Sequence, residues 1–562
     1  MTLRESRLWS LLLAAIPFMA AQARAQDIIP VTLHIDASQT RGTFEPFWRF
    51  FGYDECNFTY MTFGQKLLGE LGQLGSDQVY IRCHHLLTSG DGSPGMKWGS
   101  TGIYHVDASG QPVYDFTIVD RIFDTYLIHG VRPYVQLGFM PKDLSTRPDL
   151  YPTRIDPNVR VPVDGGQAYP PKDYDQWREL IRQWVMHCVQ RYGRAEVEKW
   201  YFEVWNEPDI SYWKGTPQQY YKLYDYAVDG VLSVLPTARV GGPEAAGNAR
   251  WLRAFLEHCL HGMNYATRAT GSPLDFVSFH AKGSPTFVDG HVCMGLAHEL
   301  QVIDRNFAVI SSIPELKNIP VVIGECDPDG MAARPVSEAP ALGYRNTTMF
   351  SSYTAAAFAR IAELADQYKI NLTGALTWSF EFENKPYFAG YRTLASNGID
   401  LPVMNVFRMY GKMGGQRLAV QDAADLGLPA MMQSPVREKP DMYAVASRLP
   451  GKLCVMVWHY ADDDIPGPAA SVEMDLSHLP AEFAGAKVTE YRIDQDHSNA
   501  YALWTQMGSP QNPTVEQYVQ LQQAGQLAMN GIPRALMVED GGATIHADLP
   551  RQAVSLFVIQ SQ

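Results

Sequence analysis

The feature that most constrains this sequence is an alternation of short β-rich runs and amphipathic helical patterns between residues 45 and 415. The runs are rich in β-branched and aromatic residues, whereas the segments between them repeat apolar residues with the period of a helix. The eight candidate strands cover residues 48–52, 78–82, 132–138, 199–205, 238–241, 275–279, 319–324 and 372–378. Helical patterns lie between them, for example at residues 173–192, 217–235, 297–310 and 344–367. Eight strand–helix repeats predict an α/β fold, a (β/α)8 TIM barrel over residues 45–418.

The pattern changes after about residue 420, where apolar and polar residues begin to alternate one by one. Such alternation, broken by turns, predicts strands of an antiparallel sheet with one buried face. We therefore expect an accessory antiparallel β-sandwich domain over residues 419–562, packed on the barrel. Residues 28–35 alternate in the same way, so the segment 26–44 is predicted to add an N-terminal strand to this sandwich.

The first 25 residues have the layout of a secretory signal peptide. Arg4 and Arg7 precede an apolar run over residues 8–21, and Ala23-Arg24-Ala25 has the small-x-small form of a cleavage site. The apolar run is too short for a transmembrane helix. The mature protein is therefore expected to begin near Gln26 and to be periplasmic or secreted.

The composition argues against polyanionic partners. A formal net charge of −14 at pH 7 repels nucleic acid and anionic membrane surfaces, so neither is expected as a partner. The seven cysteines have no metal-ligand spacing, and no Gly-rich phosphate loop or nucleotide fingerprint is present. We expect no metal and no cofactor, and a neutral small molecule as the ligand. The oligomeric state is left open.

The predicted fourth strand ends on a pair of polar residues. Residues 201–208 read Tyr-Phe-Glu-Val-Trp-Asn-Glu-Pro, in which an apolar strand delivers Asn206 and Glu207 to its carboxyl end. Pro208 cannot continue a regular strand ladder, so both side chains are expected at the edge of the barrel. The carboxyl ends of the strands are the face on which TIM barrels carry their chemistry.

A second carboxylate follows three strand–helix units later. Residues 319–324 form an apolar strand that ends on Glu325, and Cys326-Asp327-Pro328 interrupts it. Glu207 and Glu325 should then face each other across the mouth of the barrel. Two such carboxylates are sufficient for glycoside hydrolysis, because one protonates the leaving oxygen and the other attacks the anomeric carbon or activates water.

Several segments together resemble glycoside hydrolase family 39. Trp200–Pro208 (WYFEVWNEP) and Ile323–Pro328 (IGECDP) look like the acid/base and nucleophile strands of that family. Further similar segments are YIRCHHLL at residues 80–87, GFMP at 138–141, GGP at 241–243, SFH at 278–280, YRID at 491–494, GSPQNP at 508–513 and LPR at 549–551. The C-terminal segments resemble the β-xylosidase branch, and α-L-iduronidases are more distant members of the family.

The resemblance implies a role for each candidate site residue. Glu207 would be the general acid/base and Glu325 the nucleophile of a retaining exo-glycosidase that hydrolyses β-xylosidic bonds at the non-reducing ends of xylo-oligosaccharides. The substrate-binding residues would be Asn206, on the sugar 2-hydroxyl, and His84, His280, Trp378 and Glu383, around the sugar ring.

Departures from the family pattern leave the sugar open. Ala281-Lys282 follow His280, the segment 379–383 is shorter than usual, and Asp54-Glu55 add acidic groups after the first strand. One alternative is the same machinery acting on an arabinoside or a uronic-acid glycoside, for which Lys282 would suit the carboxylate. A second alternative is a carbohydrate-binding protein without catalysis.

Overall fold

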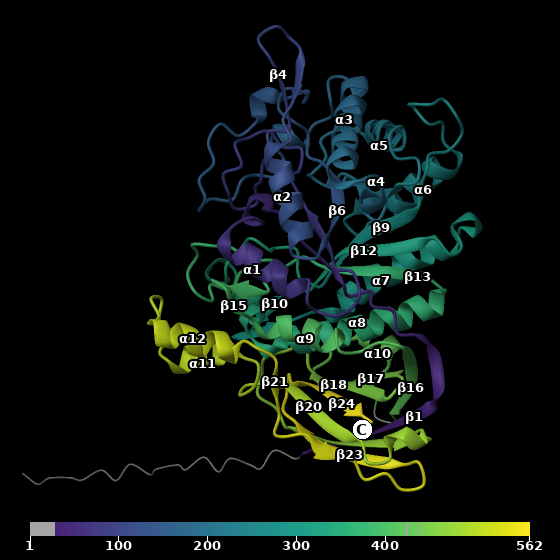
Figure 1. Cartoon of the computed structure of the whole chain (residues 1–562), viewed down its shortest axis with the longest axis vertical. Helices are drawn as coiled ribbons and strands as arrows, with labels where there is room; N and C mark the ends of the chain where they lie inside the picture. The colour runs from purple at the N-terminus through teal and green to yellow at the C-terminus, as the bar shows by residue number, and fades with distance from the viewer. Residues whose placement is uncertain (1–27, 423–424, 438, 562) are drawn as a thin grey trace, which may run out of the picture.

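The computed structural model describes residues 28–422, 425–437 and 439–561, and eight parallel strands close into a barrel in its upper part (Figure 1). The strands are β2 (Phe50–Tyr53), β3 (Tyr80–Cys83), β6 (Arg132–Leu137), β7 (Tyr201–Val204), β8 (Arg239–Ala245), β9 (Phe276–Lys282), β12 (Pro320–Asp327) and β13 (Asn371–Thr377). Each pairs with the next in sequence, and β13 pairs with β2 to close the ring. The predicted TIM barrel is confirmed. The predicted signal peptide, residues 1–25, lies outside the described residues.

Helices and short hairpins surround the strands. The helices are α1 (Thr62–Leu71), α2 (Thr117–Ile128), α3 (Tyr174–Tyr192), α4 (Arg194–Val197), α5 (Pro217–Leu232), α6 (Ala249–His261), α7 (Leu296–Ser311), α8 (Thr348–Tyr368) and α9 (Pro402–Tyr410). The hairpins pair β4 (Tyr104–Val106) with β5 (Pro112–Tyr114), β10 (Thr286–Val288) with β11 (His291–Cys293), and β14 (Ala395–Ser396) with β15 (Ile399–Asp400). Side chains at the N-cap positions stabilise the first turn of several helices. At the start of α5, for example, Thr216 and Gln219 form a capping box.

The barrel interior is layered because every second residue of a strand points inward. An aromatic and aliphatic layer lies toward the amino ends of most strands and contains Phe50, Tyr80, Tyr134, Tyr201, Phe276, Val322 and Leu376. Two positions further along their strands lie Arg82, Gln136, Glu203 and Ser278, all fully buried. Within this polar layer Arg82 and Glu203 form a fully buried ion pair, and the layer lies next to the carboxyl-end face of the barrel.

The accessory domain is a curled ten-stranded sheet at the lower end of Figure 1. Its strands are β1 (Ile29–Thr43), β16 (Gln416–Asp422), β17 (Asp441–Leu449), β18 (Lys452–Tyr460), β19 (Ala470–Ser477), β20 (Lys487–Ile493), β21 (Ala528–Met529), β22 (Arg534–Ala535), β23 (Ala543–Leu549) and β24 (Val554–Gln560). The described pairs are antiparallel except β1 with β19, so the N-terminal strand does join this sheet, partly in parallel. Three short helices lie between these strands in the sequence: α10 (Leu428–Gln433), α11 (Ala500–Gln506) and α12 (Val515–Ala524).

Strand β18 shows how the sheet is joined to the barrel. Leu453, Val455 and Val457 face a core inside the curled sheet, whereas the alternating residues Cys454, Met456 and Trp458 belong to the core shared with the barrel helices. Both faces of this strand are therefore buried, and α8 lies between the sheet and the barrel (Figure 1).

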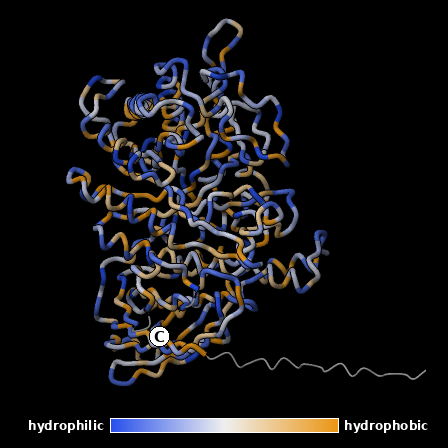
Figure 2. Tube along the Cα trace, turned by 180° about the vertical axis from the view of Figure 1, so that it is seen from behind, coloured by the Kyte–Doolittle hydropathy of each residue, from blue (hydrophilic) through white to orange (hydrophobic). Residues whose placement is uncertain are grey.

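No described helix is both long and apolar enough to cross a membrane. Hydrophobic and hydrophilic residues instead alternate over short distances along the trace (Figure 2). All seven cysteines lie in the described part of the chain, where each is buried and free.

Candidate active site

The loop after β7 has a backbone that few large side chains adopt. Trp205 and Glu207 have φ values of +74° and +43°, in the left-handed region. Tertiary hydrogen bonds hold this conformation: the Trp205 amide donates to the carbonyl of Leu137 (3.2 Å), and the Glu207 amide donates to the carbonyl of Glu244 (2.9 Å). The Trp205 ring is fully buried and donates to the carbonyl of Tyr212. The strained turn is thus fixed by its surroundings and orients the Glu207 side chain.

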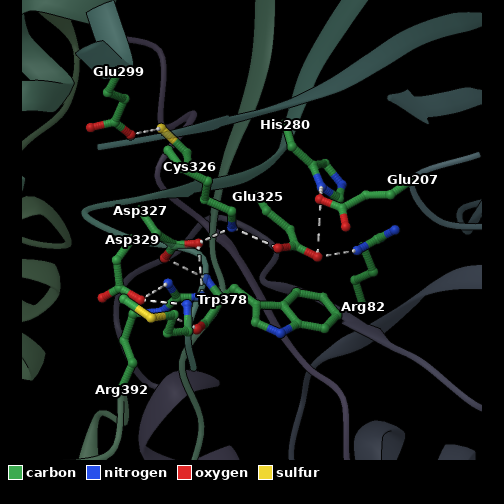
Figure 3. A network of polar contacts seen from close by, with 12 residues as sticks. Arg82, Glu207, His280, Glu299, Glu325, Cys326, Asp327, Asp329, Trp378 and Arg392 are labelled. Atoms are coloured by element: carbon green, nitrogen blue, oxygen red, sulfur yellow. Dashed lines mark hydrogen bonds and ion pairs between the residues drawn. The ribbon is translucent and has the colours of Figure 1, made fainter. Parts of the chain in front are cut away.

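The carboxylates of Glu207 and Glu325 face each other at the carboxyl end of the barrel (Figure 3). One oxygen of each, together with a ring nitrogen of His280, lie within 4.8 Å of one another. His280 Nδ1 lies 2.9 Å from Glu207 Oε1 and 3.8 Å from Glu325 Oε1. The side chains of Glu207 and Glu325 are only 14% and 8% exposed, which leaves each open to a ligand from one side. The arrangement can bring an acid and a nucleophile to one bound atom.

Arg82 connects several residues at the base of the site. Its guanidinium, fully buried, donates to Glu203, to Asn206 Oδ1 (2.9 Å) and to Glu325 Oε1 (3.3 Å). It also lies 5.0 Å from the centre of the Trp378 ring. Asn206 Nδ2 is buried and has no hydrogen-bond partner among the described residues. One strong donor is therefore left over for a ligand, as the predicted contact with a sugar hydroxyl requires.

Three cations surround Glu325. Lys282 Nζ lies 2.6 Å from its Oε2, and Arg82 and His280 lie near its Oε1. Burial on its own would raise the pKa of Glu325, but Lys282, His280 and Arg82 hold that pKa well below its ordinary value. The carboxylate is therefore ionised over the whole working pH range of a protein, as a nucleophile needs to be.

Lys282 itself is shared between two carboxylates. Its ammonium lies 2.6 Å from Glu325 and 2.8 Å from Asp327, and its side chain is 18% exposed. Asp327 also accepts a hydrogen bond from the Trp378 amide (2.9 Å) and lies 3.4 Å from Arg392. The sequence left the role of Lys282 undecided, and the structure gives it a direct contact with Glu325.

His84 and Trp378 meet around Asp54. His84 Nδ1 lies 2.8 Å from Asp54, the Trp378 indole donates to Asp54 (3.1 Å), and the two rings are 4.3 Å apart between centroids. Lys97 forms a 2.7 Å ion pair with the same carboxylate. Burial alone would raise the pKa of Asp54, but Lys97 and His84 lower it well below its ordinary value. Asp54 is therefore ionised and holds His84, Trp378 and Lys97 together along one wall of the site.

Six of the seven predicted site residues are brought together in this way: His84, Asn206, Glu207, His280, Glu325 and Trp378. The seventh, Glu383, accepts a hydrogen bond from the amide of Phe63 in α1, and no hydrogen bond or ion pair joins it to the other six. A role for Glu383 in sugar binding stays a prediction.

Sequence reasoning missed Arg82, Lys97, Glu203 and Glu244. Arg82 and Glu203 could have been noticed, because each is a charge inside an otherwise apolar strand and such a charge needs a partner. Lys97 lies outside the helices and strands and Glu244 lies at a bulge of β8, with φ values of +56° and +55°, and no strand or helix pattern in the sequence marks either residue.

One group of three described residues, Glu207, His280 and Glu325, could in principle share a metal ion, since their ligand atoms lie within 4.8 Å of one another. Arg82 and Lys282 already neutralise Glu325 from its other sides, which disfavours a further cation. The donor set fits proton transfer and nucleophilic attack better than metal binding.

Glu299 supports the strand of Glu325 from the helix layer. It lies in α7, is 1% exposed, and accepts hydrogen bonds from Cys326 (3.2 Å) and Tyr353. Burial raises its pKa to about 8 from an ordinary value of 4.5. Between these two pH values the unfolded chain loses this proton and the folded chain keeps it, so stability must fall as the pH rises.

Glu299→Gln should remove that fall, because an amide does not ionise in either state. We expect the variant to gain about 3–4 kcal/mol relative to the wild type when unfolding at pH 8 is compared with unfolding at pH 5. Urea denaturation of both proteins at the two pH values measures it, with the exposed Glu315→Gln as the matched control. An equal difference between the proteins at both pH values would contradict this account of Glu299.

Comparison with known proteins agrees with this geometry. The family model for glycosyl hydrolases family 39 matches residues 31–540. A β-xylosidase of Geobacillus stearothermophilus is 27% identical over 494 residues, covering 86% of each chain. An α-L-iduronidase of Mus musculus is 24% identical over 568 residues, covering 93% of this chain and 79% of its own. The crystal structure of a monomeric β-xylosidase from Caulobacter crescentus CB15 superposes with a TM-score of 0.72 at 22% identity, over 94% of this chain and 99% of that one. The chain therefore belongs to glycosyl hydrolase family 39.

Proposed function

We propose that this protein is a retaining exo-glycosidase that releases β-D-xylose from the non-reducing ends of xylo-oligosaccharides. The observation that carries the proposal is the separation of at most 4.8 Å between one oxygen of Glu207 and one of Glu325. Retaining glycosidases have carboxyl groups about 5–5.5 Å apart, whereas inverting ones need about 6.5–9.5 Å to admit a water molecule. Relatives named β-xylosidases support the choice of sugar.

The reaction follows from the two carboxylates. Glu325 attacks the anomeric carbon while Glu207 protonates the leaving oxygen, so the glycosidic bond breaks and a glycosyl–enzyme ester forms. Glu207, now ionised, then takes a proton from water as that water attacks the anomeric carbon. The ester bond breaks, xylose leaves with its original configuration, and both carboxyl groups return to their starting states. The free Nδ2 of Asn206 is suited to the sugar 2-hydroxyl during both steps.

A uronic-acid glycoside is the second candidate substrate. It is favoured by Lys282, whose ammonium lies in the site and whose side chain is 18% exposed, and by the iduronidases among the relatives. Against it, both Glu325 and Asp327 already neutralise that ammonium. A non-catalytic binding protein is disfavoured, since both carboxylates and their charged partners are in place. Export to the periplasm or the medium is part of the proposal and rests on the sequence of residues 1–25 alone.

The proposal is tested by following the hydrolysis of aryl β-D-xyloside, aryl α-L-arabinoside and aryl α-L-iduronide by proton NMR. We expect xyloside cleavage to be fastest and β-xylose to form first, with the α-anomer appearing later by mutarotation. Initial formation of α-xylose would exclude retention. Cleavage of only the other two substrates would replace the sugar assignment, and binding of xylo-oligosaccharides without any cleavage would indicate the non-catalytic alternative.

A further inference from the structure

Glu244 lies between the two catalytic strands and has no role in the reaction just described. It is fully buried near the end of β8, which stands between β7, the strand before Glu207, and β9. Its φ is +55°, and the register between β8 and β9 shifts between Pro243 and Ala245. The bulge turns the Glu244 side chain out of the normal alternation, and such bulges re-aim side chains beside active sites.

Glu244 contacts both sides of the acid/base residue. Its backbone carbonyl accepts the hydrogen bond of the Glu207 amide (2.9 Å), which holds Glu207 in its left-handed conformation. Its carboxylate Oε2 lies 3.0 Å from His280 Nε2, while the other ring nitrogen, Nδ1, lies 2.9 Å from Glu207 Oε1. Glu244 thus holds the main chain of Glu207 by a hydrogen bond and contacts its carboxyl group indirectly, through His280.

The nucleophile strand is shaped to receive the Glu244 carboxylate. A Cβ on Gly324 would lie only 1.7 Å from Glu244 Oε2, so this carboxylate fills the space that any other residue at position 324 would need. The register between β9 and β12 shifts at the same point, between Ile323 and Glu325. The Glu244 carboxylate therefore lies between a bulge in β8 and a bulge in β12. It is packed close to the backbone that carries Glu207 and to the backbone that carries Glu325.

The charges around Glu244 decide the protonation of His280. Glu244 Oε1 accepts a hydrogen bond from Tyr134 (3.0 Å) and lies 4.0 Å from Arg82, and both contacts favour its anionic form. A carboxylate lies within 3.0 Å of each ring nitrogen, by a hydrogen bond at Nδ1 and by an ion pair without hydrogen-bond geometry at Nε2, so the charged form of His280 is favoured. Burial alone would lower the pKa of His280, but Glu325, Glu207 and Glu244 raise it to about 9.

We propose that Glu244 is a positioning residue for the acid/base step. Through its charge beside Nε2 it keeps His280 protonated on both nitrogens, so that Nδ1–H occupies Glu207 Oε1 and leaves Oε2 to carry the proton that goes to the leaving oxygen. The assignment rests on the proposed function of Glu207. It predicts that Glu244 matters most where the leaving group needs that proton, and little where the leaving group departs unaided.

The test compares Glu244→Gln with the wild type on two aryl β-xylosides. Glutamine keeps the size of the side chain and removes the charge that holds the second proton on His280. For phenyl β-xyloside we expect kcat/KM to fall about 30-fold, less than the roughly 10²–10⁴-fold of a lost general acid because Glu207 itself remains, and for 2,4-dinitrophenyl β-xyloside less than about 3-fold. Glu299→Gln is the matched control, since it replaces another buried carboxyl group beside β12 with an amide, and both substrates should respond equally to it. Equal losses on both substrates with Glu244→Gln would overturn the proposal.

A second measurement does not depend on activity toward xylosides. In protein labelled with ¹⁵N-histidine, both His280 nitrogens should be protonated at pH 7.5, and one should lose its proton in Glu244→Gln. The His280 signals are assigned by their loss in His280→Gln. A neutral His280 in the wild type would overturn the proposal. Wild-type inactivity on aryl xylosides would contradict the proposed substrate alone, and the leaving-group comparison would then use the aryl glycoside that is cleaved.

Discussion

Glu325→Gln should lower kcat on phenyl β-xyloside by on the order of 10⁴-fold, the largest single loss we expect in this chain. Lys282, Arg82 and His280 keep the wild-type carboxylate ionised, as the proposed attack on the anomeric carbon requires. A neutral amide is a poor nucleophile and leaves the three cations without their shared counter-charge. Both the glycosylation step and the electrostatic balance of the pocket are lost together.

A mechanism-based label measures this prediction directly. An activated 2-deoxy-2-fluoro-β-xyloside should react once with the wild type and add the mass of one fluorosugar to the peptide that contains Glu325. Asp327→Asn is the matched control, because Asp327 is the other carboxylate on Lys282 and should slow labelling without moving it. Labelling of a different carboxylate, or near-normal turnover by Glu325→Gln, would show that the nucleophile is another residue.

The barrel could be predicted because each strand carries its own local pattern, whatever its neighbours are. The residues at which the strands end could not be predicted in the same way. The strand predicted at residues 319–324 continues in β12 to Asp327, so Glu325 lies within a paired strand, and β8 runs to Ala245 instead of ending at residue 241. Both extensions contain a register shift, which arises from pairing between strands and leaves no signal along one strand.

The site shows the same division. Glu207 and Glu325 could be predicted because each follows an apolar run of the sequence, where a carboxylate has little structural use. The sequence indicates that Arg82 and Glu203 are buried charges, but it does not indicate that they pair with each other. Their side chains meet only once the barrel has closed. Glu244 follows Gly241-Gly242-Pro243, where the alternation of inward and outward residues breaks down. Its inward direction depends on a positive φ that no local pattern demands.

Glu207→Ala should separate the two steps of the proposed reaction. With phenyl β-xyloside, kcat/KM should fall about 10³-fold, because the leaving oxygen no longer receives a proton. With 2,4-dinitrophenyl β-xyloside, the first step needs no acid and should stay fast. Hydrolysis of the glycosyl–enzyme still needs a base, so the intermediate should accumulate and the product should appear as a burst followed by slow turnover.

Azide tests whether that loss belongs to an acid/base residue. The missing side chain leaves room beside the anomeric carbon, and removal of its charge ends the repulsion of anions, so azide should restore turnover and form β-xylosyl azide. Asp209→Asn is the matched control, because Asp209 lies two residues further along the same loop, and its carboxylate accepts a hydrogen bond from the Ala246 amide (2.8 Å). That variant should gain nothing from azide. An α-configured azide product would mean that azide displaced the aryl group without a glycosyl–enzyme, and would exclude the pairing of Glu207 with Glu325. A β-azide formed by Glu207→Ala alone requires both residues in the roles proposed for them.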